Sequence, residues 1–200
     1  MARVSSQDRR DQLVEAAIRV ATRDGVSSVT TRTVAAEAGA TPGIVHYVFH
    51  SMTDLLREMI KAIADEQVHS VTSVQVEGST VRECLERAFE ALWSTLESEP
   101  EVHQLTYEVT QFALRNDELR ELAAWQYQCY FAASVAVLES VAKVARIEWA
   151  RPVDSLARGL VAVNDGITLA WLADRNTARA RETHLHTIDY LVALARPIAD

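Results

Sequence analysis

The chain of 200 residues contains few residues that break helices or cross-link chains: six glycines, four prolines and two cysteines. So little Gly and Pro, beside abundant Ala, Leu, Val, Glu and Arg, favours helices. Two cysteines exclude a disulfide framework or a zinc cluster, and we expect Cys84 and Cys129 to be buried free thiols in a reducing cytosol. The sequence predicts about nine helices and no convincing strand, so the expected fold class is all-α.

Long apolar runs are also missing. No run reaches the ~20 residues of a membrane helix, and the N-terminal segment, which contains Asp8 and Asp11, is too polar for a signal peptide. We therefore expect a cytoplasmic protein with no membrane partner. Apolar residues still make up 48% of the chain, which is enough for a folded core.

Basic charge is scarce, because 20 Lys and Arg face 28 Asp and Glu, a net charge of −8. Residues 1–50 hold six arginines and five acidic residues, a net +1, and the remaining residues carry the acidity. This balance excludes a protein coated in basic surface. It does not exclude DNA binding, because the distribution of charge matters more than its sum. It predicts weak non-specific DNA binding.

Capping residues divide the N-terminal part into four helices. Side chains that can accept a backbone N–H, or a proline at the first helical position, mark the helix starts at Ser5, Thr30, Thr41–Pro42 and Ser51. Glycine supplies the C-terminal stops, at Gly25 and Gly39.

Residues 30–49 predict two short helices joined by a tight turn at Gly39. This is the outline of a helix-turn-helix, whose second helix lies in the DNA major groove. Residues at the start of that helix would reach base edges, and polar residues around it would contact phosphates. The predicted DNA contacts are Thr31, Arg32, Thr41, Pro42, Gly43, Ile44, His46, Tyr47, His50 and Ser51. A helical hairpin buried in an all-α core is the structural alternative, and His46 is either a phosphate donor or a half-buried spacer.

Over residues 8–68 the chain resembles the TetR family of bacterial transcriptional regulators. The resemblance rests on Thr30–Thr31–Arg32, Ala38–Gly39, the run from Gly43 to Phe49, Ser51, and Asp54–Leu55–Leu56. The chain departs from the family at two places: His46 stands where an aromatic residue, often Tyr, is usual, and Met52 where Lys is common. Without that Lys, the N-terminus of the following helix must supply more of the phosphate contact.

The expected organisation is a helix-turn-helix domain over residues 1–50, with its motif at about 30–49 and the family-type domain reaching about 68. A helical effector-binding and dimerisation domain occupies 51–200. Within it, residues 76–79 break the helical pattern. Further helices are expected to start near Thr80, Asn116, Pro152 and Ala178, and the last of them runs to Pro197. The helix from Thr80 should end at Glu99–Pro100, and the next helix runs through Leu105, Val109 and Phe112.

The resemblance implies that the last two helices pair across a two-fold axis and that a small effector binds in the same domain. Small and apolar residues on these helices predict a dimer interface of Gly159, Val163, Gly166, Ala170, Ile188, Leu191 and Ala195. Clustered aromatic and polar residues predict an effector site, although each could equally be plain core: Trp93, His103, Tyr107, Phe112, Trp125, Tyr130, Asn164 and Trp171. Asn164 and Asp165 could instead pair across the dimer or face water.

The leading hypothesis is a ligand-responsive repressor that binds a palindromic DNA operator as a homodimer and is released by a small apolar or amphipathic effector. The alternatives are an enzyme with a helix-turn-helix appendage and a helical protein-interaction module. No nucleophile–base set or phosphate loop supports an enzyme. We expect no cofactor and no metal, because the His184-x-His186 spacing does not place both rings on one helix face.

Overall fold

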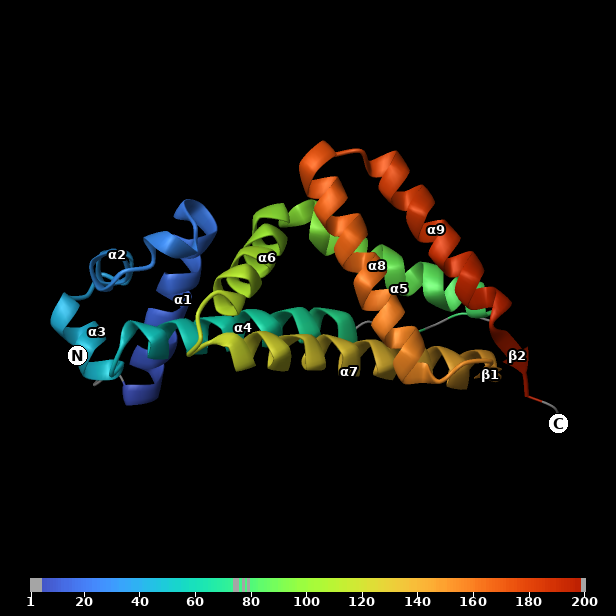
Figure 1. The fold of residues 1–200 in the computed structure, drawn as a ribbon, viewed down its shortest axis with the longest axis horizontal. Coiled ribbons are helices and arrows are strands. Elements are labelled where there is room, and N and C mark those ends of the chain that lie inside the picture. The colour runs from blue at the N-terminus through green and yellow to red at the C-terminus, as the bar shows by residue number, and fades with distance from the viewer. Residues whose placement is uncertain (1–4, 74–75, 77, 79, 199–200) are drawn as a thin grey trace. The chain divides into compact units, whose positions relative to one another are not determined.

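The structure, a computed structural model, describes residues 5–73, 76, 78 and 80–198. Within these residues the chain forms nine α-helices, one 3₁₀ helix and two three-residue strands (Figure 1). The all-α class is confirmed. The elements are α1 (Ser6–Asp24), η1 (Val26–Ser28), α2 (Thr31–Glu37), α3 (Pro42–Val48), α4 (Met52–Thr72), α5 (Val81–Ser98), α6 (Pro100–Leu114), α7 (Arg120–Ala145), β1 (Ile147–Trp149), α8 (Val153–Asp174), α9 (Thr177–Ala193) and β2 (Ala195–Pro197).

The chain divides into two compact units, each made of two segments. The first unit is Met1–Glu66 with Glu101–Gln126, and the second is Gln67–Pro100 with Tyr127–Asp200. Helices α4 and α7 contribute residues to both units. The predicted break at 76–79 lies partly outside the described residues, at Glu77 and Ser79. The functional division at residue 50 stays a prediction.

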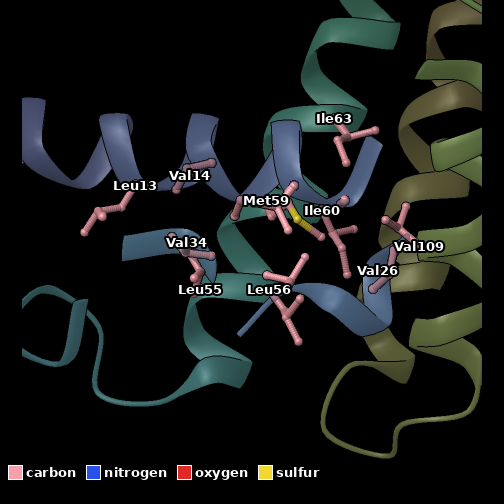
Figure 2. Packing of buried hydrophobic residues seen from close by; sticks show 14 of the residues in the cluster. Leu13, Val14, Val26, Val34, Leu55, Leu56, Met59, Ile60, Ile63 and Val109 are labelled. Atoms are coloured by element: carbon pink, nitrogen blue, oxygen red, sulfur yellow. The ribbon is translucent and has the colours of Figure 1, made fainter. Parts of the chain in front are cut away.

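The core of the first unit collects one face from each of its helices. On α4 the buried residues recur at helical spacing, at Leu55, Met59, Ile60 and Ile63. Figure 2 shows these side chains together with Leu13 and Val14 of α1, Val34 of α2, Val26 of η1 and Val109 of α6. Helix α6 therefore shares the hydrophobic core of the helix-turn-helix.

The second unit contains two apolar clusters. One joins α7, α8 and α9 through buried aliphatic residues such as Leu138, Leu156 and Ile188. The other contains Trp93 of α5 with Ile167 and Trp171 of α8. These clusters bury the inward faces of α5, α8 and α9 within the protomer.

The prediction of no strand is wrong at two short segments. β1 and β2 pair antiparallel, with Ile147 opposite Pro197 and Trp149 opposite Ala195. Consequently the last helix ends at Ala193 rather than at Pro197, and Ala195 lies in a strand. Three residues are too short to produce the alternating pattern by which a strand is recognised in a sequence.

The predicted helix starts are largely confirmed. Ser5 and Thr30 each form a capping box, and the hydroxyl of Thr80 accepts the N–H of Glu83 at 3.2 Å. Helix α7 begins at Arg120 rather than at Asn116, because the side-chain oxygen of Asn116 accepts the N–H of Glu118 at 3.1 Å in a turn. In the described residues, each helix is too short or too polar to span a membrane.

Candidate nucleic-acid interface

The turn between α2 and α3 is fixed by local hydrogen bonds. The hydroxyl of Thr30 accepts the N–H of Thr33 at 3.2 Å, and the Thr33 hydroxyl accepts the N–H of Thr30 at 2.9 Å. Gly39 follows α2 with φ +60°, a conformation that costs other residues energy. The N–H of Ala40 then donates to the carbonyl of Ala35 at 2.8 Å and closes the turn. These bonds set the direction in which α3 leaves α2.

Helix α3 has one buried face and one open face. Val45 and Phe49 are each only 2% exposed and hold α3 against the core. On the opposite side Tyr47 is 88% exposed, an unusual environment for a large aromatic side chain. The other predicted contacts on the open face are Thr41, Pro42, Gly43 and His46, whereas Ile44 is half-buried against the core.

The first turn of α3 leaves room for a close approach. The Thr41 hydroxyl makes no capping hydrogen bond to the helix that it precedes. Among the residues that the structure describes, and apart from the backbone of α3 itself, a Cβ added at Gly43 would meet only the Thr41 hydroxyl, at 3.9 Å. Packing within the protein therefore does not require glycine at position 43, and a surface that approaches DNA would benefit from it.

The start of α4 contacts α2 through Met52, one of the two residues that depart from the pattern of the resemblance. The hydroxyl of Thr31 donates to the sulfur of Met52 at 3.4 Å, and Met52 also packs against the first unit's core. The Ser51 hydroxyl accepts the N–H of Asp54 at 3.1 Å and caps α4. His50 is exposed, with Nδ1 3.8 Å from the carboxylate of Asp54. Met52 thus makes an intramolecular contact at the start of α4.

Arg10 supports α3 from α1, a role that the sequence did not reveal. Its guanidinium lies 4.5 Å from the centre of the Phe49 ring and donates to the carbonyl of Val48 at 3.4 Å. It also lies 3.7 Å from the carboxylate of Glu58. Nothing local in the sequence links residues 10 and 49, so only the fold could show this contact.

Two other arginines are paired within the domain. Glu37 accepts from Arg19 Nε at 2.9 Å and from Arg23 Nη1 at 3.0 Å. The hydrogen bonds from Arg19 and then Arg23 hold the pKa of the Glu37 carboxyl below its usual range. The guanidiniums that remain for DNA around the helix-turn-helix are therefore fewer than the sequence count indicated, and exposed Arg32 is one of them.

Four of the predicted effector residues lie in the second unit. The rings of Trp93 and Trp171 meet edge to face, with centroids 5.6 Å apart. Beside them, Phe89 stacks on His184 with centroids 3.4 Å apart. The Trp93 Nε1 and His184 Nδ1 atoms are buried without a hydrogen-bond partner among the described residues. Burial lowers the pKa of His184 to about 4, so this imidazole is neutral at physiological pH.

The carboxylate of Asp165 is hydrogen-bonded within the protomer. The other two predicted effector residues of the second unit are Tyr130 and Asn164, and Asn164 is half-buried. The Asp165 carboxylate accepts the phenol O–H of Tyr127 at 2.8 Å. Burial and this hydrogen bond raise the pKa of Tyr127 above its usual range. The Tyr127 ring meets the Tyr130 ring edge to face, at 5.7 Å.

The other four predicted effector residues lie in the first unit. His103, Tyr107 and Trp125 are half-buried, and burial lowers the pKa of His103. Phe112 lines a surface recess together with the turn residues Arg115, Asn116, Asp117 and Glu118. The predicted effector set is thus divided between the two units, four residues in each.

The predicted dimer residues fall into three groups. Gly159, Gly166 and Ala170 are exposed on one side of α8, with Val163 half-buried beside them. Ile188 and Leu191 are 2% and 3% exposed within the protomer's own core, so they are not available to a partner. Ala195 lies in β2. Helical spacing placed Ile188 and Leu191 on an apolar face of the last helix, but that face packs inward.

These features define a helix-turn-helix DNA-binding protein: a capped support helix, a glycine turn, and a short second helix with a buried face and an open polar face. Comparisons with known proteins agree. Residues 13–59 match the profile described as bacterial regulatory proteins, tetR family. The chain is 30% identical, over 187 residues that cover 94% of it and 95% of its relative, to the HTH-type nicotine-responsive transcriptional repressor HdnoR of Paenarthrobacter nicotinovorans.

Solved structures show the same similarity. The multidrug binding protein EbrR, crystallised with imidazole, is 27% identical with a TM-score of 0.66, and the match covers 96% of this chain and 97% of EbrR. A transcriptional regulator from Rhodococcus sp. Rha1 matches with a TM-score of 0.75 over 95% of this chain and 99% of its own, and at 18% identity it shows the fold alone.

The chain belongs to the tetR family of bacterial regulatory proteins. It is a DNA-binding transcriptional regulator rather than an enzyme, as its sequence predicted.

Proposed function

We propose that the protein is a homodimeric repressor in the bacterial cytoplasm that binds a palindromic operator through α3 and leaves it when a small effector binds. The observation that carries the DNA-binding part is the 88% exposure of Tyr47 on a helix whose neighbours Val45 and Phe49 are buried. A phenol in that position can donate to a phosphate oxygen, while Thr41 and Gly43 lie where base edges would be reached.

The exposed side of α8 supports the dimer. Glycine and alanine at positions 159, 166 and 170 allow two helices to approach closely. Apart from the adjacent backbone of α8, no atom of the described residues lies within 4 Å of a Cβ added at Gly159 or Gly166. Leu169, 48% exposed, and Leu185 of α9, 45% exposed, would be covered in a dimer. Two copies of α3 would then read two half-sites of a palindrome.

The relatives' names favour an aromatic nitrogen compound as the effector. HdnoR is described as nicotine-responsive, and EbrR was crystallised with imidazole and with ethidium. The second unit contains an aromatic cluster in which Trp93 Nε1, a donor, and His184 Nδ1, a second polar atom, are buried with no hydrogen-bond partner in the described part of the chain. Such a cluster suits a planar ring that carries nitrogen. The effector acts by binding one arrangement of the DNA-binding heads more tightly than the other.

The test is DNA binding by the purified full-length protein. Footprinting on the DNA around its own gene should show one protected palindrome, and light scattering should give the mass of a dimer. A dimer that protects no palindrome in that DNA would contradict the proposal.

Tyr47→Ala should then weaken operator binding by at least about a hundredfold, because a hydrogen bond to a charged group is worth about 1.5–3 kcal/mol and the dimer would lose two. Helicity and thermal stability should stay unchanged, since the side chain is exposed. Tyr190→Ala is the matched control: Tyr190 is also an exposed tyrosine, 59%, but lies on α9. Equal loss of binding in both variants would contradict the role given to Tyr47.

A further inference from the structure

The connection between α1 and α2 is capped by a residue far away in the sequence. η1 begins after Gly25, which has no side chain to accept the N–H groups at the start of this 3₁₀ helix. The carboxylate of Glu108, on α6, accepts the N–H of Val26 at 2.7 Å. A hydrogen bond from an amide to a carboxylate at this distance is charge-assisted and strong.

The backbone around Gly25 is shaped to admit this carboxylate. Gly25 has φ +85°, a region that other residues adopt only with strain. A Cβ at this position would lie 3.1 Å from Glu108 Oε1. Glycine therefore serves both the backbone conformation and the close approach of α6.

Apolar packing holds Glu108 in register with η1. Val109, the next residue of α6, is fully buried, and Val26 is 3% exposed. Both belong to the core that also contains Ile60 and Ile63 of α4 (Figure 2). A second bond ties α4 to the turn after α6: Arg57 Nη2 donates to the carbonyl of Glu118 at 3.0 Å. α6 and the turn after it are thus joined to η1 and α4 by side-chain hydrogen bonds as well as by packing.

We propose that Glu108 is a positioning residue for DNA binding: its carboxylate holds the α1–α2 connection in the DNA-competent arrangement, and loss of its bond to Val26 lowers operator affinity. This inference rests on the proposed function. η1 leads directly into α2, which packs on α3.

Electrostatics and positioning predict opposite results when Glu108 is neutralised. Removing a negative charge from an acidic protein should strengthen DNA binding. Loss of the bond to Val26 should weaken it, because a loosened α1–α2 connection must be ordered again on the operator. Glu108→Ala removes the acceptor, and Glu108→Gln keeps the shape with a weaker, uncharged acceptor.

The experiment measures operator affinity and Val26 amide hydrogen exchange in the full-length dimer, using the footprinted operator fragment as the probe. We expect Glu108→Ala to bind about tenfold more weakly, within the usual range of coupling between sites, and Glu108→Gln to fall between it and wild type. Glu101→Gln is the charge-matched control, an exposed carboxylate of the same helix, and should stay within about twofold of wild type or bind slightly tighter.

Val26 exchange separates positioning from general damage. In wild type, operator DNA should slow exchange of this amide, because coupling between two sites is reciprocal. In Glu108→Ala the amide should exchange faster and respond less to DNA. If Glu108→Ala is unstable, Glu108→Gln gives the same readouts at a folded fraction checked by circular dichroism.

Two outcomes overturn the role of Glu108. One is operator binding by Glu108→Ala and Glu108→Gln as tight as wild type, even when Val26 exchange is faster. The other is unchanged Val26 exchange in both variants. Failure of the wild-type protein to bind any operator is a different result, because it removes the proposed function itself.

Discussion

Two aromatic residues, Tyr47 and Trp93, show how differently the two units of this protein use large side chains. Tyr47 is 88% exposed on α3, and its neighbours in the chain hold the helix in place. Trp93 is 2% exposed on α5. Its ring meets those of Phe89 and Trp171, and it shares an apolar cluster with Ala180 of α9. The first side chain is free to contact another molecule, whereas the second is part of the protein's own packing.

This contrast separates affinity from stability. Substitutions on the open face of α3 should change DNA binding and leave unfolding nearly unchanged. Substitutions in the cluster of Phe89, Trp93, Trp171 and His184 should change unfolding first, and in the absence of effector they should change DNA binding only through the folded fraction. The following substitutions test that separation from the buried cluster outward.

Trp93→Ala should have the largest effect on stability, a loss of about 3–5 kcal/mol, because it removes a buried indole and leaves a cavity. Urea denaturation followed by circular dichroism measures the change. Trp125→Ala, at a half-buried tryptophan of the first unit, is the comparison and should lower the free energy of unfolding by less. A Trp93→Ala protein as stable as wild type would show that the cluster is not a packed core.

His184 should make the protein less stable in mild acid. Its pKa is about 4 in the folded chain and near 6.5 when unfolded, so between these values the unfolded state binds a proton that the folded state excludes. The free energy of unfolding therefore keeps its full value, as far as His184 is concerned, above about pH 6.5. It falls as the pH drops, by about 2 kcal/mol at pH 5. Unfolding free energies at pH 7.5 and 5 measure this loss.

The variant His184→Leu should remove that pH dependence, whereas His186→Gln, at an exposed histidine on the same helix, should keep it. Burial also lowers the pKa of His103, so this residue should add a smaller loss of unfolding free energy as the pH falls. An identical pH profile in wild type and His184→Leu would place the titrating group elsewhere.

The two glycines of the helix-turn-helix should respond oppositely to alanine. Gly39→Ala should destabilise the protein by about 1 kcal/mol, because its φ is positive. Gly43→Ala should leave the free energy of unfolding unchanged or raise it by up to about 0.5–1 kcal/mol, because alanine favours helix. It should nevertheless weaken operator binding, because it adds a methyl group to the open face of α3. Thermal melts and operator titrations measure both. Unchanged operator affinity in Gly43→Ala would mean that DNA does not approach this turn.

Local signals explain which parts of the structure could be predicted from the sequence. The helix cap at Thr30 and the turn at Gly39 each depend on residues within a few positions, and the sequence predicts both. Val34, Val45 and Phe49 lie at helical spacing around that turn, which favours one inward face, and all three are buried.

The remaining features depend on contacts between distant residues. Arg10 on Phe49 and Glu108 on Val26 join residues 39 and 82 positions apart, which no spacing rule reveals. Periodicity placed Ile188 and Leu191 on an apolar face but could not tell whether the protomer or a partner covers it. The strand pair of β1 and β2 was missed for the same reason, because each strand exists only through the other.

The pairing of Arg19 and Arg23 with Glu37 has a consequence for how many molecules a cell needs. A chromosome offers millions of non-specific sites that compete with one operator. Arginines that are neutralised within the domain release few counterions on random DNA, so those sites retain little of the protein. We expect a small number of copies to be enough to keep the operator occupied.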